Sequence, residues 1–148
     1  MNCEDFVKNY KGYQNMEGEI LSSCFDHVRD CESCSDVMTA VQLKIDGVDL
    51  ERYPCVHMAK YATFKCDKHS DSIECDDVII LYSPKFDEYA INDPRPARTP
   101  IRNCPWCGTK LPNKSELWFS ELEKLGYDDP FDQDIPEQYK SDAWYKHS

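Results

Sequence analysis

The amino-acid sequence predicts an α+β protein with two parts, a small helical unit followed by an antiparallel sheet with a C-terminal helix. Three observations lead to this fold class. Apolar residues recur at helical spacing through the first third of the 148 residues, a run of β-formers follows at Asp77–Ser83, and another helical stripe comes after residue 113. The pattern changes near Tyr53-Pro54, which places a first domain at 1–48 and a second at 53–148.

Three short helices account for the first domain. Their apolar positions are Cys3, Phe6, Val7 and Tyr10, then Ile20, Leu21, Cys24 and Val28, then Val37, Met38 and Val41. Gly12, Gly18 and the pair Asp46-Gly47 separate or end them. Below roughly 70 to 80 residues a hydrophobic core rarely supplies more than about 3–5 kcal/mol, so a unit this small needs a staple such as a disulfide or a metal.

The cysteines are candidates for that staple. There are nine, an odd number, and two pairs have CxxC spacing, Cys31/Cys34 and Cys104/Cys107, which favours thiolate ligands over disulfides. The first ten residues lack the basic and apolar regions of a signal peptide, and no apolar run approaches the roughly 18 residues of a membrane helix. We therefore expect a cytoplasmic protein with reduced thiols and no membrane partner.

The second expected helix brings zinc-competent residues together. His27 and Cys31 stand at positions i and i+4, so they share one helix face, and Cys34 follows one turn later. A structural zinc site is tetrahedral and needs a fourth ligand, which Cys3 can supply if the first helix folds back on the second. The sequence therefore predicts a zinc site made of Cys3, His27, Cys31 and Cys34.

The motif HxxxCxxC from His27 to Cys34, preceded by an early cysteine and followed by an apolar helix, resembles zinc-binding anti-sigma domains. The resemblance covers the first third of the chain. It implies a small helical zinc domain that grips a sigma factor and in some members releases it when the thiols are oxidised. This sequence departs from the family in having an extra thiol, Cys24, and in continuing into a second domain rather than a membrane helix with a periplasmic sensor.

The second domain begins its sheet at Asp77–Ser83 (DVIILYS) and continues through the weakly alternating Phe86–Ile91. Pro100–Asn103 then leads into Cys104-Pro-Trp-Cys107-Gly. In this CPxCG motif the proline and glycine permit a tight turn whose amide groups point at the sulfurs, which is typical of a zinc knuckle.

One knuckle supplies two ligands, so a second zinc site needs two more. The sequence offers Cys55, His57, Cys66, His69 and Cys75. Thiolates suit a closed structural site, and our order of preference is Cys75, Cys55, Cys66 and then His69. Cys55 and Cys66 are expected to share one face of a helix across AKYATFK. The whole chain is therefore expected to hold two structural Zn²⁺ ions.

After the knuckle, Asn113 is predicted to cap a helix with Glu116 as its capping-box partner. The stripe of that helix should pack as core, and Gly126 should end it; the stripe residues are Leu117, Trp118, Leu122 and Leu125. The tail from Tyr127 to Trp144 mixes acids with aromatic residues. We expect the rings to dock the tail on the domain, the alternative being that they anchor a partner.

Three segments of the second domain, YSPKFDEYAI, NCPWCGTKLP and ELWFSELEKLGYDDPFDQDIPEQYKSDAW, together resemble an uncharacterised bacterial zinc-ribbon-like domain family. The resemblance covers most of residues 53–145. It implies a fold and a metal but no established activity.

The net charge of the chain and the absence of catalytic motifs limit the classes of function that the sequence supports. The net charge of −11 and pI near 4.7 oppose unaided nucleic-acid binding and suit a basic protein partner. The sequence has no HExxH, no HxE with PCxxC, no glycine-rich phosphate loop and no GxSxG, so an enzyme is not expected and a zinc-dependent enzyme is the remotest alternative. We expect a zinc-binding bacterial interaction module that acts as an inhibitor or immunity-type protein, for example against a toxin. The alternative is an anti-sigma-like regulator whose partner is a sigma factor.

Overall fold

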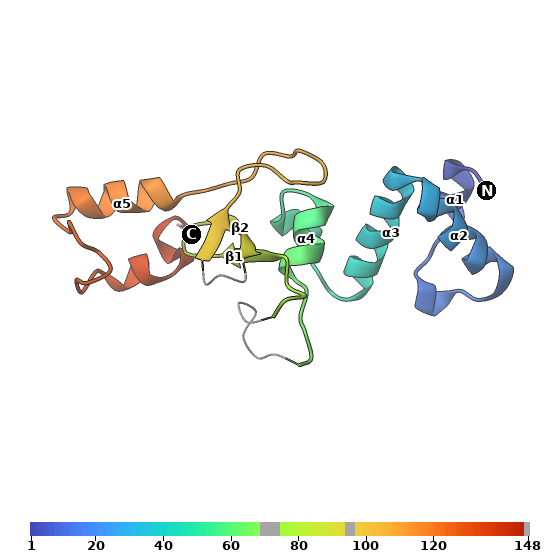
Figure 1. Cartoon of the computed structure of the whole chain (residues 1–148), viewed down its shortest axis with the longest axis horizontal. Helices are drawn as coiled ribbons and strands as arrows, with labels where there is room; N and C mark the ends of the chain where they lie inside the picture. Colours follow the sequence, from blue (N-terminus) through green and yellow to red (C-terminus); the bar gives the residue numbers. More distant parts are fainter. Residues whose placement is uncertain (69–74, 94–96, 147–148) are drawn as a thin grey trace. The chain divides into compact units, whose positions relative to one another are not determined.

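The computed structural model describes residues 1–68, 75–93 and 97–146 (Figure 1). The chain divides into two compact units, Met1–Thr63 and Phe64–Ser148. Within the described residues there are five α-helices and one three-stranded antiparallel sheet, which confirms the predicted α+β class. None of the helices in the described residues has the length and apolarity of a membrane span.

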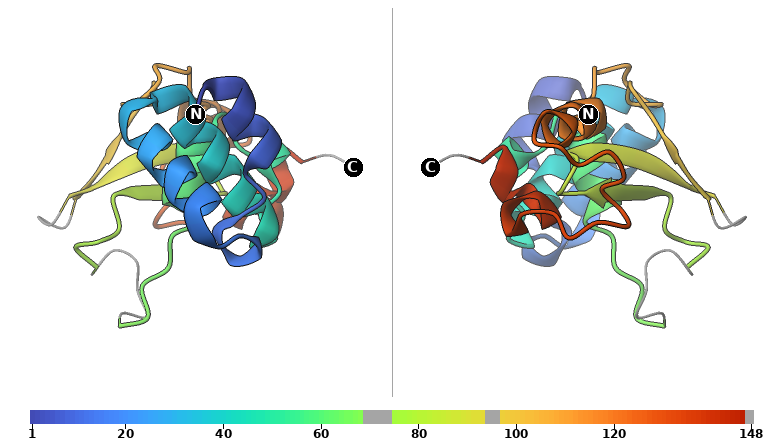
Figure 2. Two further views of the ribbon diagram at one scale, coloured as in Figure 1. Left: turned by 90° about the vertical axis from the view of Figure 1, so that its right-hand side faces the viewer. Right: turned by 90° about the vertical axis from the view of Figure 1, so that its left-hand side faces the viewer.

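The first unit contains the three predicted helices and a fourth. They are α1 (Cys3–Asn9), α2 (Gly18–Asp30), α3 (Glu32–Ile45) and α4 (Val56–Ala62), with short 3-10 turns at Tyr13–Asn15 and Leu50–Arg52. The side chain of Asn2 caps α1 by accepting a hydrogen bond from the backbone N–H of Asp5 at 2.8 Å. Helices α1, α2 and α3 pack against one another (Figure 2).

The core of this unit is small and rich in sulfur. Phe6, Tyr10, Cys24 and Cys34 are buried, and partly buried residues from all three helices surround them, namely Met16, Leu21, Val28, Cys31, Met38 and Val41. Two of the predicted metal ligands, Cys31 and Cys34, are thus also part of the packed core. A metal ion bound by these thiols would therefore directly affect how the three helices pack.

Helix α4 lies in the first unit, although the sequence boundary was placed before it, near Tyr53. It packs on α3 and on the Leu50–Arg52 turn, so the division by contacts falls after Thr63. The helix ends at Ala62, where Thr63 and Phe64, both weaker helix formers, follow. Cys66 lies beyond that end, so the expectation that Cys55 and Cys66 share one helix face is wrong.

The sheet of the second unit has the order β1 (Ile80–Ser83), β2 (Glu88–Asp93) and β3 (Ala97–Pro100). Ser83 pairs with Glu88, which closes a hairpin between β1 and β2. The turn ends at Asp87, whose φ is +46°, and its carboxylate accepts from the Tyr82 hydroxyl at 2.7 Å and the Lys114 ammonium at 2.6 Å. These two bonds tie the hairpin to the segment that enters the last helix.

Helix α5 (Ser115–Lys124) packs on the C-terminal tail. Trp118 and Leu122 form a buried cluster with Ile135, Tyr139 and Trp144. The Trp118 indole N–H donates to the Tyr139 carbonyl at 2.9 Å, and the Trp144 indole N–H donates to the Lys85 carbonyl at 2.6 Å. The prediction that aromatic residues dock the tail is confirmed for these rings.

The ends and stripe of α5 differ in detail from the prediction. Lys114 is the N-cap residue, and Asn113 accepts from the backbone N–H of Ser115 at 2.9 Å, so the predicted cap is displaced by one residue. Gly126, with φ of +95°, closes the helix as expected. Leu117 and Leu125 are 52% and 56% exposed, which makes the buried stripe narrower than predicted.

Candidate metal centres

The predicted ligands of the first unit come together in the structure. The ligand atoms of Cys3, His27, Cys31 and Cys34 all lie within 4.8 Å of one another, and the Cys3 and Cys31 sulfurs are 3.8 Å apart. Three thiols and one imidazole at this spacing match the donor set of a closed tetrahedral site. The group is therefore compatible with one bound metal ion.

The local chain explains this convergence. Cys3 begins α1, and Cys31 is both the residue that ends α2 and the residue that precedes α3. The break at Cys31 turns the chain, so that His27, one turn before it, and Cys34, in the first turn after it, face the same point. Two helices and their junction thus position three of the four groups.

The surroundings of the His27 ring indicate whether the site fits a metal ion. Its Nε2 atom is buried and has no hydrogen-bond partner within the described residues, while its ring stacks on Phe6 at 5.6 Å. A buried polar atom without a partner is costly, and a metal bond would satisfy it. The donor set and this nitrogen together fit a thiophilic divalent ion such as zinc.

The thiols of this group also differ in acidity. Hydrogen bonds from the Ser33 hydroxyl and from the backbone N–H of Cys34 lower the pKa of Cys31 to about 6. Burial, followed by the neighbouring Cys3 and Cys31 thiols, raises the pKa of Cys34 to about 12. Several negative charges cannot share this small volume unaided, and a divalent cation would remove that conflict.

The knuckle forms the predicted tight turn in the second unit. The Cys104 carbonyl accepts from the N–H of Gly108 at 2.8 Å, and the Cys104 N–H donates to the Thr109 carbonyl at 2.8 Å. Gly108 has φ of +77°, which few other residues adopt readily. The Cys104 and Cys107 sulfurs lie within 4.8 Å of each other, as two ligands of one metal must.

Cys55 and His57 form a second pair, in the first unit at the start of α4. Cys55 is the N-cap residue, and its sulfur lies within 4.8 Å of a ring nitrogen of His57. His57 Nε2 lies 2.9 Å from a carboxylate oxygen of Asp36 on α3. A carboxylate on one imidazole nitrogen is the usual arrangement behind a metal-ligating histidine, because it fixes the ring and its tautomer.

Cys66 and Cys75, two candidates for completing the knuckle, lie together with Asp77 in a third group. The three ligand atoms are all within 4.8 Å of one another. Cys104 and Cys107 are not members of this group. His69, the remaining candidate, lies outside the described residues, and which residues complete the knuckle stays a prediction.

Two carboxylates were missed by the sequence analysis. Asp36 contacts His57, and Asp77 joins Cys66 and Cys75. Asp77 stands two residues after a cysteine, a spacing that could have drawn attention to it. Asp36 could not have been found, because its contact depends on α4 packing against α3.

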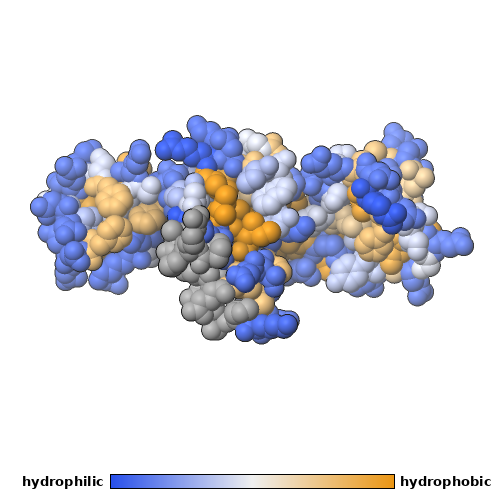
Figure 3. Space-filling model, viewed as in Figure 1, coloured by the Kyte–Doolittle hydropathy of each residue, from blue (hydrophilic) through white to orange (hydrophobic). Residues whose placement is uncertain are grey.

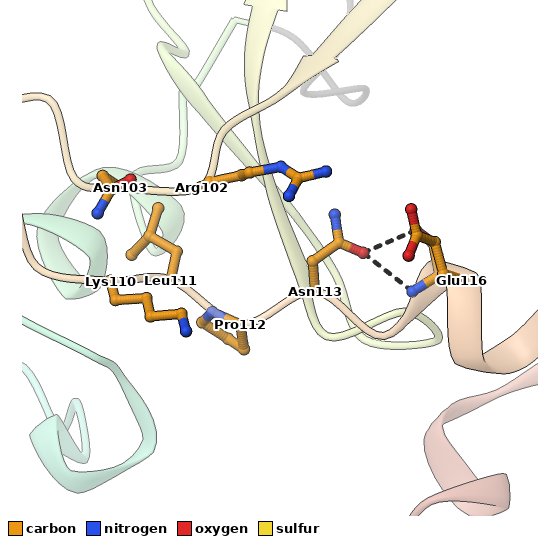
Figure 4. A pocket seen from close by; sticks show the side chains of 8 residues that line it. Arg102, Asn103, Lys110, Leu111, Pro112, Asn113 and Glu116 are labelled. Atoms are coloured by element: carbon orange, nitrogen blue, oxygen red, sulfur yellow. Dashed lines mark hydrogen bonds between the residues drawn. The ribbon is translucent and has the colours of Figure 1, made fainter.

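A pocket of 440 Å³ lies beside the knuckle in the second unit. Its lining comes from the two segments that flank the turn, and Figure 4 shows Arg102 on one of them and Asn113 on the other; the lining residues are Arg102, Asn103, Lys110, Leu111, Pro112, Asn113, Ser115 and Glu116. It contains one carboxylate, two basic residues and no thiol or imidazole. The pocket therefore contains none of the candidate metal ligands described above.

The fold and these groups define an α+β protein organised around candidate metal centres. The chain belongs to a family described as a domain of unknown function, DUF6980, whose model matches residues 52–147. Cys55, Cys66, Cys75 and the knuckle lie inside that match, whereas the group of Cys3, His27, Cys31 and Cys34 precedes it. No curated protein and no solved structure matches the chain.

Proposed function

We propose that this protein is a bacterial cytoplasmic interaction module, stapled by zinc, that acts as an inhibitor or immunity-type protein by covering a basic surface of a protein partner. One Zn²⁺ is held by Cys3, His27, Cys31 and Cys34, and a second by the knuckle with two further ligands. Both ions stabilise the fold rather than take part in a reaction, since thiolate-rich sites with a full ligand set have no position for a substrate.

The observation that carries this proposal is the surface formed by α5 and the following tail. Phe119 and Phe131 are 42% and 66% exposed and pack edge-to-face with ring centroids 5.6 Å apart. Exposed acids of the same segment accompany them, namely Asp128, Asp129, Asp132 and Asp134. We call these six residues the acidic aromatic surface. Figure 3 shows apolar patches among hydrophilic residues at the end of the chain that carries α5.

The charge of this segment is strongly one-sided. Residues 127–140 contain five carboxylates and one lysine, and that lysine, Lys140, already pairs with Asp134 and Glu137. Exposed acids speed the capture of a basic partner, and exposed aromatic rings supply the contact area that holds it. The surface therefore combines the two properties expected of such a binding site.

A small pocket on this surface suits a basic side chain. Its volume is 230 Å³, and Phe119, Glu123, Tyr127, Asp128 and Pro130 line it. Two carboxylates and two rings are favourable surroundings for an arginine or lysine. The chain provides its own example, because the Lys85 ammonium lies 4.4 Å from the ring centre of Trp118 and 5.4 Å from that of Phe131.

Affinity capture from the native host, followed by mass spectrometry and binding kinetics with the captured protein, tests this function. We expect a basic partner whose association slows as salt rises, because exposed charges are screened over about 8 Å at physiological ionic strength. Replacing Asp128, Asp129, Asp132 and Asp134 by Asn should slow association, and Phe131→Ala should speed dissociation.

A matched variant separates local from overall charge. Replacing the exposed Glu17, Glu19, Asp46 and Glu51 by their amides removes the same four charges from the first unit. We expect it to bind the partner with nearly the wild-type rate. If both quadruple variants slow association equally, the effect comes from net charge. If the association rate changes neither with salt nor in either variant, the proposed surface is refuted.

A second candidate function rests on the first unit. Ile20 and Phe25 are 54% and 45% exposed on α2, the helix that also carries His27. Exposed apolar side chains on a helix that supplies a zinc ligand suit the anti-sigma-like alternative. If a sigma factor is captured instead, Phe25→Ala should weaken its binding while the changes at Phe131 and the tail acids have no effect.

A further inference from the structure

The group of Cys66, Cys75 and Asp77 takes part neither in the zinc site of the first unit nor in the acidic aromatic surface. It places two thiols and one carboxylate within 4.8 Å of one another. Cys75 is 1% exposed, Cys66 is half-buried and Asp77 is exposed. The donors thus lie at the edge of the fold, with one side turned to solvent.

A rigid frame holds this group. The side-chain amide of Asn92, on β2, donates to the carbonyls of Cys75 and Val78 at 3.1 and 3.0 Å. The Val78 N–H donates to the Cys75 carbonyl at 3.2 Å, so the residues from 75 to 78 form a tight turn anchored to the sheet. The position of the Cys75 sulfur is therefore set by the edge of the sheet rather than by a free loop.

Backbone amides point at both sulfurs. The Lys68 N–H donates to the Cys66 sulfur at 3.4 Å. Burial raises the pKa of the Cys75 thiol, and the backbone N–H groups of Asp77 and Val78 oppose that rise. Amides two and three residues after a cysteine are the arrangement that stabilises thiolates in metal-binding turns. A buried thiol that serves only as core packing has no need of such donors.

From this geometry we propose that Cys66, Cys75 and Asp77 form a third metal site, separate from the knuckle, that binds Zn²⁺ through two thiolates and a carboxylate. Among the residues that the structure describes, these three supply the ligands, and we assign the fourth coordination position to water or another exogenous donor. A site of this kind holds zinc more weakly than one with four protein ligands, and it exchanges the ion with solvent. This inference is independent of the proposed protein interaction.

Metal counts on paired variants distinguish this site from the knuckle. The reduced protein is equilibrated with buffered Zn²⁺, and bound zinc is counted by native mass spectrometry. Cys66→Ser/Cys75→Ser should lose one ion, Cys104→Ser/Cys107→Ser should lose one, and the combined variant should lose two. If Cys66 and Cys75 complete the knuckle instead, the combined variant will lose only one, and the proposal is wrong.

A milder pair of variants keeps the test valid if the serine variants misfold. Asp77→Asn preserves the size of the side chain and both thiols, and Asp76→Asn makes the same change at a neighbour outside the group. We expect Asp77→Asn to lower the affinity of one zinc by at least about tenfold, since loss of even a supporting residue costs about 10- to 100-fold. Asp76→Asn should leave it unchanged. Equal affinities in the two variants, or a native intact mass lower by two hydrogens from a Cys66–Cys75 disulfide, would overturn the site.

Discussion

At the scale of single residues, the buried nitrogen of His27 and the opposed acidities of Cys31 and Cys34 have one common explanation. A buried nitrogen without a partner is costly in a core, and thiols this close cannot all ionise without a cation. With a cation bound, the nitrogen gains a partner, and the crowded thiols can ionise together. The four residues are thus better suited to holding a divalent ion than to packing as neutral side chains.

The variant His27→Ala tests this explanation. It should remove one zinc per chain and destabilise the helices of the first unit, because the remaining three thiols form an incomplete site. Metal analysis and far-ultraviolet circular dichroism measure both effects. Retention of the wild-type zinc content would show that the imidazole is not a ligand.

Cys24 provides the matched control for that variant. It is fully buried in the same core but is not one of the four candidate ligands Cys3, His27, Cys31 and Cys34. Cys24→Ala should therefore lower the stability of the unit through lost packing while the zinc content stays at the wild-type value. Loss of an ion from Cys24→Ala would mean that zinc content follows general destabilisation.

The sequence best predicted those site residues whose relative positions depend on spacing within one stretch of chain. His27 and Cys31 were predicted from their i, i+4 spacing, Cys34 from the CxxC spacing one turn later, and Cys3 from the need for a fourth ligand. Asp36 and Cys66 show the limit. Asp36 reaches His57 only because two helices pack together, which the sequence does not show. Cys66 was predicted to lie on a helix, but that helix ends four residues earlier, at Ala62.

At the scale of elements, the tail is part of the second unit's core rather than an appendage. Trp144 is 3% exposed and bonds the Lys85 carbonyl, which lies in the turn of the β1–β2 hairpin. The sequence predicted this docking from the aromatic content of the tail. It could not tell Phe131, which stays exposed, from Tyr139 and Trp144, because the tail has no regular period.

Truncating the two kinds of ring should have different effects. Trp144→Ala should cost about 3–5 kcal/mol of unfolding free energy, the usual loss for a buried tryptophan. Phe131→Ala removes exposed ring contacts and should cost less than about 1.5 kcal/mol. Urea unfolding followed by tryptophan fluorescence, or by circular dichroism for the Trp144 variant, measures both. Equal costs would contradict the docking of the tail through Trp144.

The hairpin turn makes the second unit sensitive to alkaline pH. Burial, then the hydrogen bond to Asp87, raises the pKa of Tyr82 well above its usual value of 10.0. The folded state therefore keeps the phenol proton where the unfolded chain releases it, so this stabilisation is full below about pH 10 and falls as the pH rises further.

The variant Tyr82→Phe should lose part of that pH dependence. Its thermal midpoint should fall less steeply above pH 10 than that of the wild type, as followed by near-ultraviolet circular dichroism. Tyr13→Phe, which removes a hydroxyl from an exposed ring in the first unit, serves as the control. Parallel curves for wild type and Tyr82→Phe would show that the Tyr82–Asp87 bond contributes nothing to this dependence.

At the scale of the whole molecule, the two units differ in how far their cores depend on cysteine. The core of the first includes Cys31 and Cys34, whereas the cluster around Trp118 contains aromatic and aliphatic side chains only. Chelation should therefore unfold the first unit more completely, with loss of helical circular dichroism. The near-ultraviolet tryptophan signal should persist, because Trp106, Trp118 and Trp144 all belong to the second unit. Simultaneous loss of both signals would indicate one cooperative structure.

The zinc content of the purified, reduced protein tests the central claim most directly. After gel filtration without added metal we expect about two ions per chain, one lost in Cys31→Ser and the other in Cys104→Ser, with a weaker third ion bound only when zinc is supplied. A folded protein without zinc, or a single ion removed equally by either substitution, would contradict the account.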